Sequence, residues 1–140
     1  MPIALLLLAA CDTPPPANDV APTGSWRLVE LLSASPSIGS ARPDDPAKYE
    51  MTLANDGSVS LRLDCNRANG RWVWSATGPA EGEIVFTTLA MTRAACPPGS
   101  LDTRIAHELD SVRRYEIKGN QLTLPVMTDG GSQVWSRVAQ

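Results

Sequence analysis

Three cysteines and one histidine are the residues of this 140-residue chain best suited to nucleophilic or metal chemistry. The segment His107-Glu108-Leu109-Asp110-Ser111 starts like the zinc-protease helix motif but has serine where the second histidine is needed. A zinc site needs three or four ligands in one place, so we expect a solvated helix residue at His107, and neither a metal nor a cofactor. Cys65 or Cys96 would need an activating base to act as a nucleophile. No Gly-x-Ser-x-Gly, phosphate-loop or dinucleotide pattern occurs. These observations favour a protein that is not an enzyme.

Two tryptophans form the strongest candidate for a binding surface. Trp72 and Trp74 are two residues apart, and in a strand such residues point to the same side. The pair is suited to an apolar ligand or a protein partner, or alternatively to the hydrophobic core or a cover over its open end. We expect at least one of the two to be structural.

The overall composition limits the class of protein. A formal charge of −3 and a pI near 5.0 argue against a nucleic-acid-binding surface, which is usually basic. The length and the 43% apolar content correspond to a single folded domain.

The first eleven residues indicate where in the cell the protein is located. Ile3 to Ala10 is an apolar run too short to span a bilayer, which needs about 20 residues, and it is typical of a secretory signal core. It ends in Leu8-Ala9-Ala10-Cys11, which resembles the lipobox of bacterial lipoproteins. That resemblance implies a signal peptide at residues 1–10 and a diacylglycerol on Cys11. The usual basic residues before the run are missing, and a buried first strand with a chance cysteine is the alternative.

The resemblance also implies a location. The chain would be anchored in a bacterial envelope membrane through lipidated Cys11 and would face the periplasm, with the choice of inner or outer membrane open. Residues 11–24 are rich in proline, which favours an extended tether, so the folded domain is predicted at 25–140.

Most of this domain has the pattern of short strands. Apolar residues alternate with polar ones from Tyr49 to Ala54 and from Val59 to Cys65, which indicates strands with one buried face. Asn55-Asp56-Gly57 predicts a hairpin turn between them, and Asn69-Gly70 predicts another turn. Further strands are expected near 26–32, 72–74, 83–88, 115–117, 122–124 and 133–138. The sequence therefore predicts a mainly β (α+β) fold, a small antiparallel barrel-like sheet.

One helix is predicted at about residues 100–114. Ser100 is a suitable N-cap, and Leu101, Ile105, Leu109 and Val112 have helical spacing. The same periodicity places His107 on the opposite, solvated face.

Two cysteines remain once Cys11 is assigned to lipid. In an oxidising compartment Cys65 and Cys96 are predicted to form a disulfide, with two free buried thiols as the alternative.

The segments around these two cysteines resemble a known family. Asp64 to Gly70 is similar to the Gly-Cys-Asn…Gly element of the META domain, the HslJ-type family of bacterial envelope proteins, and Leu89 to Cys96 is similar to its second element. Asp64 stands where glycine is commoner, and aspartate tolerates positive φ better than most residues. The resemblance implies a barrel-like β fold with one packed helix and structural roles for Asn66, Gly70 and Thr92. It implies no established catalytic activity, and some family members are linked to stress.

The sequence thus predicts a lipid-anchored, non-catalytic envelope protein with a META domain, a stress-related or interaction module. A periplasmic inhibitor of a hydrolase is the first alternative, which a rigid exposed loop bearing Arg67 or Arg93 would favour. A carrier of a small apolar ligand is the second, and it requires an open cavity.

Overall fold

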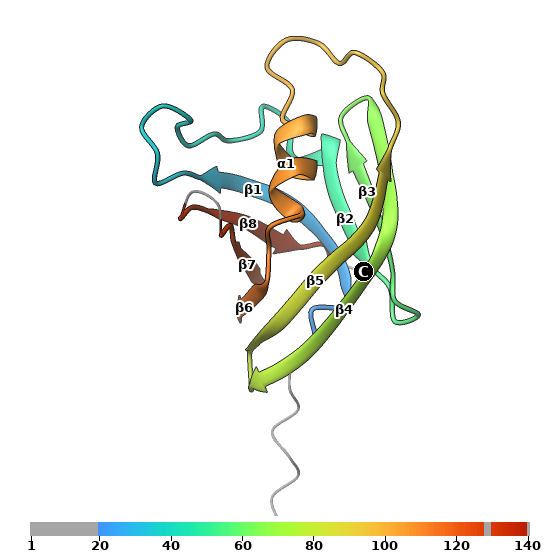
Figure 1. Ribbon diagram of the computed structural model, residues 1–140, viewed down its shortest axis with the longest axis vertical. Helices are drawn as coiled ribbons and strands as arrows, with labels where there is room; N and C mark the ends of the chain where they lie inside the picture. Colours follow the sequence, from blue (N-terminus) through green and yellow to red (C-terminus); the bar gives the residue numbers. More distant parts are fainter. Residues whose placement is uncertain (1–19, 128–129, 140) are drawn as a thin grey trace, which may run out of the picture.

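Eight antiparallel strands of the described chain form a closed barrel in sequence order, with β8 paired back onto β1 (Figure 1). The computed structural model describes residues 20–127 and 130–139. The strands are β1 Gly24–Leu32, β2 Tyr49–Leu53, β3 Ser58–Leu63, β4 Asn66–Gly78, β5 Glu81–Met91, β6 Arg114–Lys118, β7 Gln121–Pro125 and β8 Ser132–Arg137. A short 3-10 helix, η1 (Pro46–Lys48), precedes β2, and α1 (Asp102–Leu109) lies between β5 and β6. The predicted fold class is confirmed.

The interior of the barrel is filled by large side chains. In β2 and β3 every second residue is buried, as the alternation in the sequence predicts. The largest fully buried side chains come from strands all around the barrel and include Trp26, Tyr49, Tyr115 and Trp135. The predicted turn at Asn55-Asp56-Gly57 is present, and Asp56 accepts hydrogen bonds from the backbone N–H and the hydroxyl of Ser58.

The predicted turn at Asn69-Gly70 is wrong. β4 runs without interruption from Asn66 to Gly78, and the chain turns earlier, at Asp64 and Cys65. Asp64 has φ of 60°, the positive value that aspartate tolerates. Gly70 instead allows β4 and β5 to approach each other closely. It lies at a β-bulge, where a Cβ atom would meet the carbonyl oxygen of Thr87 on β5 at 2.7 Å.

The helix is shorter than predicted at both ends. Its N-cap position is Leu101, one residue after Ser100, and it ends at Leu109 instead of near Arg114. The backbone after Leu109 is used by the sheet: Val112 forms a bridge with Val126, and the carbonyl of Arg113 accepts from the N–H of Ile84. A helix could not continue through residues whose main-chain groups pair with strands.

The residues just before β1 are bonded to the barrel near the β4–β5 turn. The N–H of Val20 donates to the carbonyl of Pro79 at the β4–β5 turn, and the indole of Trp26 donates to the carbonyl of Pro22. The predicted signal peptide, Cys11 and the tether up to residue 19 lie outside the described residues. No helix in the described ranges is both long and apolar enough to cross a membrane.

Candidate functional site

A buried asparagine joins the two motif segments of the sequence. Asn66 is 1% exposed, and its side-chain amide donates to the carbonyl of Ala94 and to the carboxylate of Asp102, both at 2.9 Å. Its side-chain oxygen accepts from the hydroxyl of Thr92 at 2.9 Å and from the N–H of Ala94 at 2.8 Å. The two donors and both acceptor positions of the asparagine side chain are therefore used.

Thr92 completes this arrangement at the start of the long loop that connects β5 to α1, the 92–101 loop. Its hydroxyl accepts from the N–H of Arg67, and its own N–H donates to the carbonyl of Arg67, both at 2.9 Å. Thr92 and Asn66 thus satisfy backbone groups. Neither carries a free group aimed at a substrate.

A disulfide between Cys65 and Cys96 crosses the same region and joins residues that are separated by 31 positions in the sequence. It joins the β3–β4 turn to the 92–101 loop. Together with the bonds of Asn66 and Thr92, it holds one face of the loop to the barrel at residues 92, 94 and 96.

Asp102 is the charged member of the cluster that it forms with Asn66 and Thr92, called the motif cluster below. Burial raises the pKa of its carboxyl, but the hydrogen bond from Asn66, with further bonds from Thr103 and Ser100, outweighs burial and lowers the pKa below its ordinary value. The carboxylate is therefore kept ionised and bonded to the asparagine. The sequence analysis did not identify Asp102 as a partner of Asn66, because the two residues lie 36 positions apart and no local pattern links them.

A groove of about 680 Å³ opens beside this cluster. Leu89 and Met91 of β5 line it, as do the 92–101 loop and, from the start of α1, Asp102 and Thr103. Figure 1 shows the loop passing from the upper end of β5 over to α1. This space is called the edge groove below. Sequence reasoning singled out its motif residues but not the groove, which exists only where the loop, β5 and α1 meet.

The tryptophan pair lies elsewhere, towards the β4–β5 turn. Trp72 is 4% exposed and its indole donates to the carbonyl of Ala54, whereas Trp74 is 36% exposed. Their rings stack with centroids 6.3 Å apart, and Trp74 meets Tyr115 edge-on at 6.1 Å. Trp72 is thus part of the core, and Trp74 covers the edge of that core. The pair does not approach the motif cluster.

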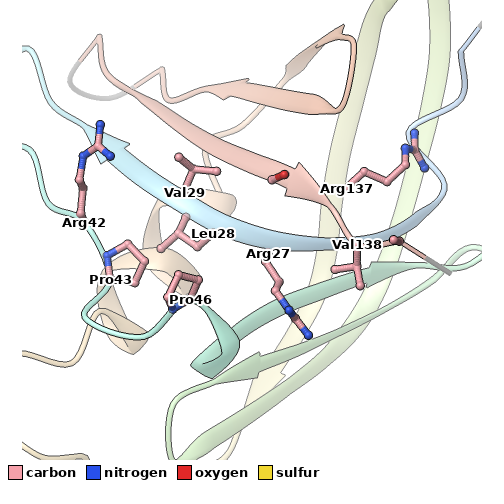
Figure 2. A pocket seen from close by; sticks show the side chains of 10 residues that line it. Arg27, Leu28, Val29, Arg42, Pro43, Pro46, Arg137 and Val138 are labelled. Atoms are coloured by element: carbon pink, nitrogen blue, oxygen red, sulfur yellow. The ribbon is translucent and has the colours of Figure 1, made fainter.

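A second hollow, of about 630 Å³, lies outside β1 and β8. Figure 2 shows Arg42, Pro43 and Pro46 on one side of it and Arg137 on the other, with Arg27 between. Each arginine already has partners. Arg27 pairs with Glu50, Arg42 pairs with Glu30, and Arg137 lies over the ring of Trp26 and donates to the carbonyl of Thr23. The hollow therefore presents no free cation to a ligand.

The helix residues that begin like a zinc motif are accounted for. His107 is exposed, while buried Glu108 accepts from Arg104 at 3.0 Å and from Gln133 at 3.2 Å. In residues 20–127 and 130–139 no group of three or more His, Cys, Asp and Glu side chains could hold a metal ion.

The two arginines considered for an inhibitory loop are placed differently. Arg67 is in β4, a regular strand, and not in a loop. Arg93 is exposed in the 92–101 loop, between the two residues, Thr92 and Ala94, that are bonded to the barrel.

The fold of this chain is similar to that of solved structures. An NMR structure of a protein from Burkholderia xenovorans is similar over 84% of this chain and 83% of its own, with 24% identity and a TM-score of 0.63. The crystal structure of a DUF4847 family protein from Bacteroides vulgatus is similar over 88% of this chain and 98% of its own, with 14% identity and a TM-score of 0.58. At these identities the likeness concerns the fold. No curated protein shows a significant match.

The family follows from the sequence motifs and from a direct match. The model of the META domain matches residues 19–139. The chain belongs to the META domain family, as the two motif segments predict. This is not a known enzyme family.

Proposed function

We propose that this chain is a lipid-anchored protein of the bacterial cell envelope whose META domain is a non-catalytic interaction module. The observation that carries the non-catalytic part is the state of the motif cluster. The polar side-chain groups of Asn66 are used up within the cluster, and Thr92 and Asp102 are bonded to it. Polar groups that are bonded to one another in this way have a structural role, because catalysis needs a group that is free to act on a substrate.

The anchoring part depends on Cys11 and on the resemblance of Leu8-Ala9-Ala10-Cys11 to a lipobox. A disulfide between Cys65 and Cys96 is consistent with an oxidising compartment, since such bonds persist outside the cytosol. Membrane attachment would be expected to need more than one acyl chain, because a single chain binds only marginally.

The anchoring test uses the cysteines themselves. Cys11→Ala should abolish labelling of the protein by palmitate and move it from the membrane to the soluble fraction, whereas Cys65→Ala should still be labelled. A Cys11→Ala protein that still pellets with membranes and takes up palmitate would contradict the proposal.

Arg93 favours a second candidate, the inhibition of a hydrolase. An exposed cation in a loop bonded to the barrel on both sides is the feature that this hypothesis requires. Inhibition of an arginine-specific protease such as trypsin by the intact protein, lost in Arg93→Ala and retained in Arg113→Ala, would support it. The third hypothesis, an apolar ligand carrier, gains no support, because large side chains fill the interior of the described barrel.

A further inference from the structure

β5 is much longer than the strand that follows it in the barrel. It pairs with β6 only through Glu81, Gly82 and Glu83. One residue further on, the N–H of Ile84 donates to the carbonyl of Arg113. From Val85 to Met91, the described residues place no strand on that side of β5, although its other side pairs with β4. The upper part of β5 is therefore an open sheet edge.

The direction of the backbone groups at this edge follows from the antiparallel pattern. The N–H of Thr92 donates to Arg67 of the β4 strand, so the main-chain groups of Thr92 face β4. Main-chain groups alternate in direction along a strand, so those of Met91 and Leu89 face away from β4, towards the edge groove. No hydrogen bond within the described residues joins them to the 92–101 loop or to α1. Unpaired strand edges of this kind are ready to pair with another chain.

The surroundings of this edge admit a single extended segment. The 92–101 loop and the start of α1 line the same groove as Leu89 and Met91, so the edge lies in a recess of about 680 Å³. The disulfide, Asn66 and Thr92 hold the loop in place without using the edge. We expect these flanking elements to favour a single peptide strand over the edge of a second barrel.

Backbone strain lies in the same stretch. Thr88 has φ of 52°, a left-handed conformation that is unfavourable for a β-branched residue. It interrupts the regular pairing with β4 between Thr87 and Ala90. Leu89 to Met91 are thereby set apart from the rest of β5.

The charge of the groove indicates what the segment should carry. Arg93 lines the groove and has no ion pair with any described residue, whereas Asp102 is already bonded to Asn66. A carboxylate on the incoming segment would meet an unpaired guanidinium.

We propose that the edge groove binds an extended, acidic polypeptide segment, which adds as a strand to Leu89–Met91 and places a carboxylate near Arg93. This inference rests on the proposed function as an interaction module and specifies the chemistry of its partner. Strand addition supplies affinity through main-chain hydrogen bonds and specificity through side-chain pockets.

The first experiment selects peptides from a random octapeptide library on the purified full-length chain in detergent micelles. The best peptide is then N-methylated at one position at a time. Strand addition predicts a loss of affinity of about tenfold or more at the alternate positions whose N–H groups pair with Leu89 and Met91, and little effect between them. Tolerance of N-methylation at every position, or failure to select any binder, would overturn the proposal.

Two site-specific measurements accompany the selection. In hydrogen exchange, the amides of Leu89 and Met91 should exchange fast in the free protein and slow down with the peptide, while the amide of Ala90, which faces β4, is slow in both. Arg93→Glu should reverse a preference for glutamate over lysine in the peptide, and the matched change Arg62→Glu on the outer face of β3 should not. Unchanged exchange at Leu89 and Met91 would overturn the proposal, and so would protection caused by self-association without peptide.

A last measurement separates this inference from the proposed function. A photo-crosslinking residue is introduced at Ala95, which is exposed and lines the groove, or at Ser60, on the exposed face of β3, in cells that carry the full chain. Crosslinking of an envelope protein through Ala95 supports the groove. Crosslinking through Ser60 alone overturns the groove but leaves an interaction module. A chain found outside the envelope contradicts the proposed function, whether or not octapeptides bind to the groove.

Discussion

Asn66→Asp is the sharpest test of the motif cluster, because it replaces one nitrogen by an oxygen and leaves the shape of the side chain unchanged. The lost nitrogen donates to the carbonyl of Ala94 and to the carboxylate of Asp102. In the variant, a second carboxyl group would lie where a 2.9 Å hydrogen bond now joins Asn66 to Asp102. Two buried carboxylates at this separation cannot both be ionised, so one must hold a proton.

The expected cost depends on pH. With an ordinary aspartate pKa of about 3.9, keeping one carboxyl protonated at pH 7 costs about 4 kcal/mol, and losing the bond to Ala94 adds about 1 kcal/mol. The free energy of unfolding of Asn66→Asp should therefore be about 5 kcal/mol below that of the unsubstituted protein at pH 7. The folded pair has a raised pKa and binds a proton that the unfolded chain releases. The deficit should thus shrink by about 1.4 kcal/mol per pH unit, to about 1 kcal/mol near pH 4.

The unsubstituted protein should respond to acid in the opposite direction. Its Asp102 has a lowered pKa, since the bond from Asn66 and its neighbours outweighs the effect of burial. The stability that this carboxylate contributes is present above its unfolded pKa of about 3.9 and is lost as the pH falls through the lower folded value.

Urea unfolding at pH 7, 6, 5 and 4 would measure these free energies. Asn69→Asp is the matched control, because Asn69 is exposed on the same strand and its deficit should stay within about 0.5 kcal/mol at every pH. A deficit of Asn66→Asp that does not change between pH 7 and pH 4 would refute the electrostatic reasoning, and equal stability at pH 7 would refute the role of the hydrogen bonds as well.

Three further predictions concern stability. Trp72→Ala should lower the free energy of unfolding by about 3–5 kcal/mol because Trp72 is buried, whereas Trp74→Ala should cost only about 1 kcal/mol; equal denaturation midpoints for both variants and the parent would contradict the core role of Trp72. Replacing Cys65 and Cys96 together by serine should cost about 2–5 kcal/mol, and mass spectrometry without reduction should show their peptides joined in protein from the envelope; thiols free to alkylation there would count against the bond. Gly82→Ala should destabilise the β5–β6 seam by about 1–3 kcal/mol, because its Cβ would collide with the carbonyl of Ser75 and lie 2.8 Å from the ring of Tyr115; a melting temperature equal to that of the parent would show that the strands yield.

The strands and hairpins were predictable because their signals are local. Alternation from Val59 to Leu63 defines both the strand and its buried face, and Asn55-Asp56-Gly57 needs only its own backbone preferences to turn. The same local reasoning failed at Asn69-Gly70, whose composition suits a turn. There the glycine is required by a neighbouring strand, β5, and not by its own φ.

The end of α1 shows the same limit of local signals. Apolar spacing continues through Val112, so periodicity alone extends the helix. Val112 instead forms a bridge with Val126, a contact that no local pattern reports.

The sequence by itself determined the barrel class, the family and the residues of its two motifs, because strand periodicity and motif spacing lie within short segments. Only the tertiary structure decided how the motif residues are used. Asn66 finds Asp102 across 36 residues, and Trp72 and Trp74, which lie on the same side of β4, differ in depth within the barrel. The open edge at Leu89–Met91 arises because β5 outruns β6, a difference in length between two strands that meet only in the closed barrel.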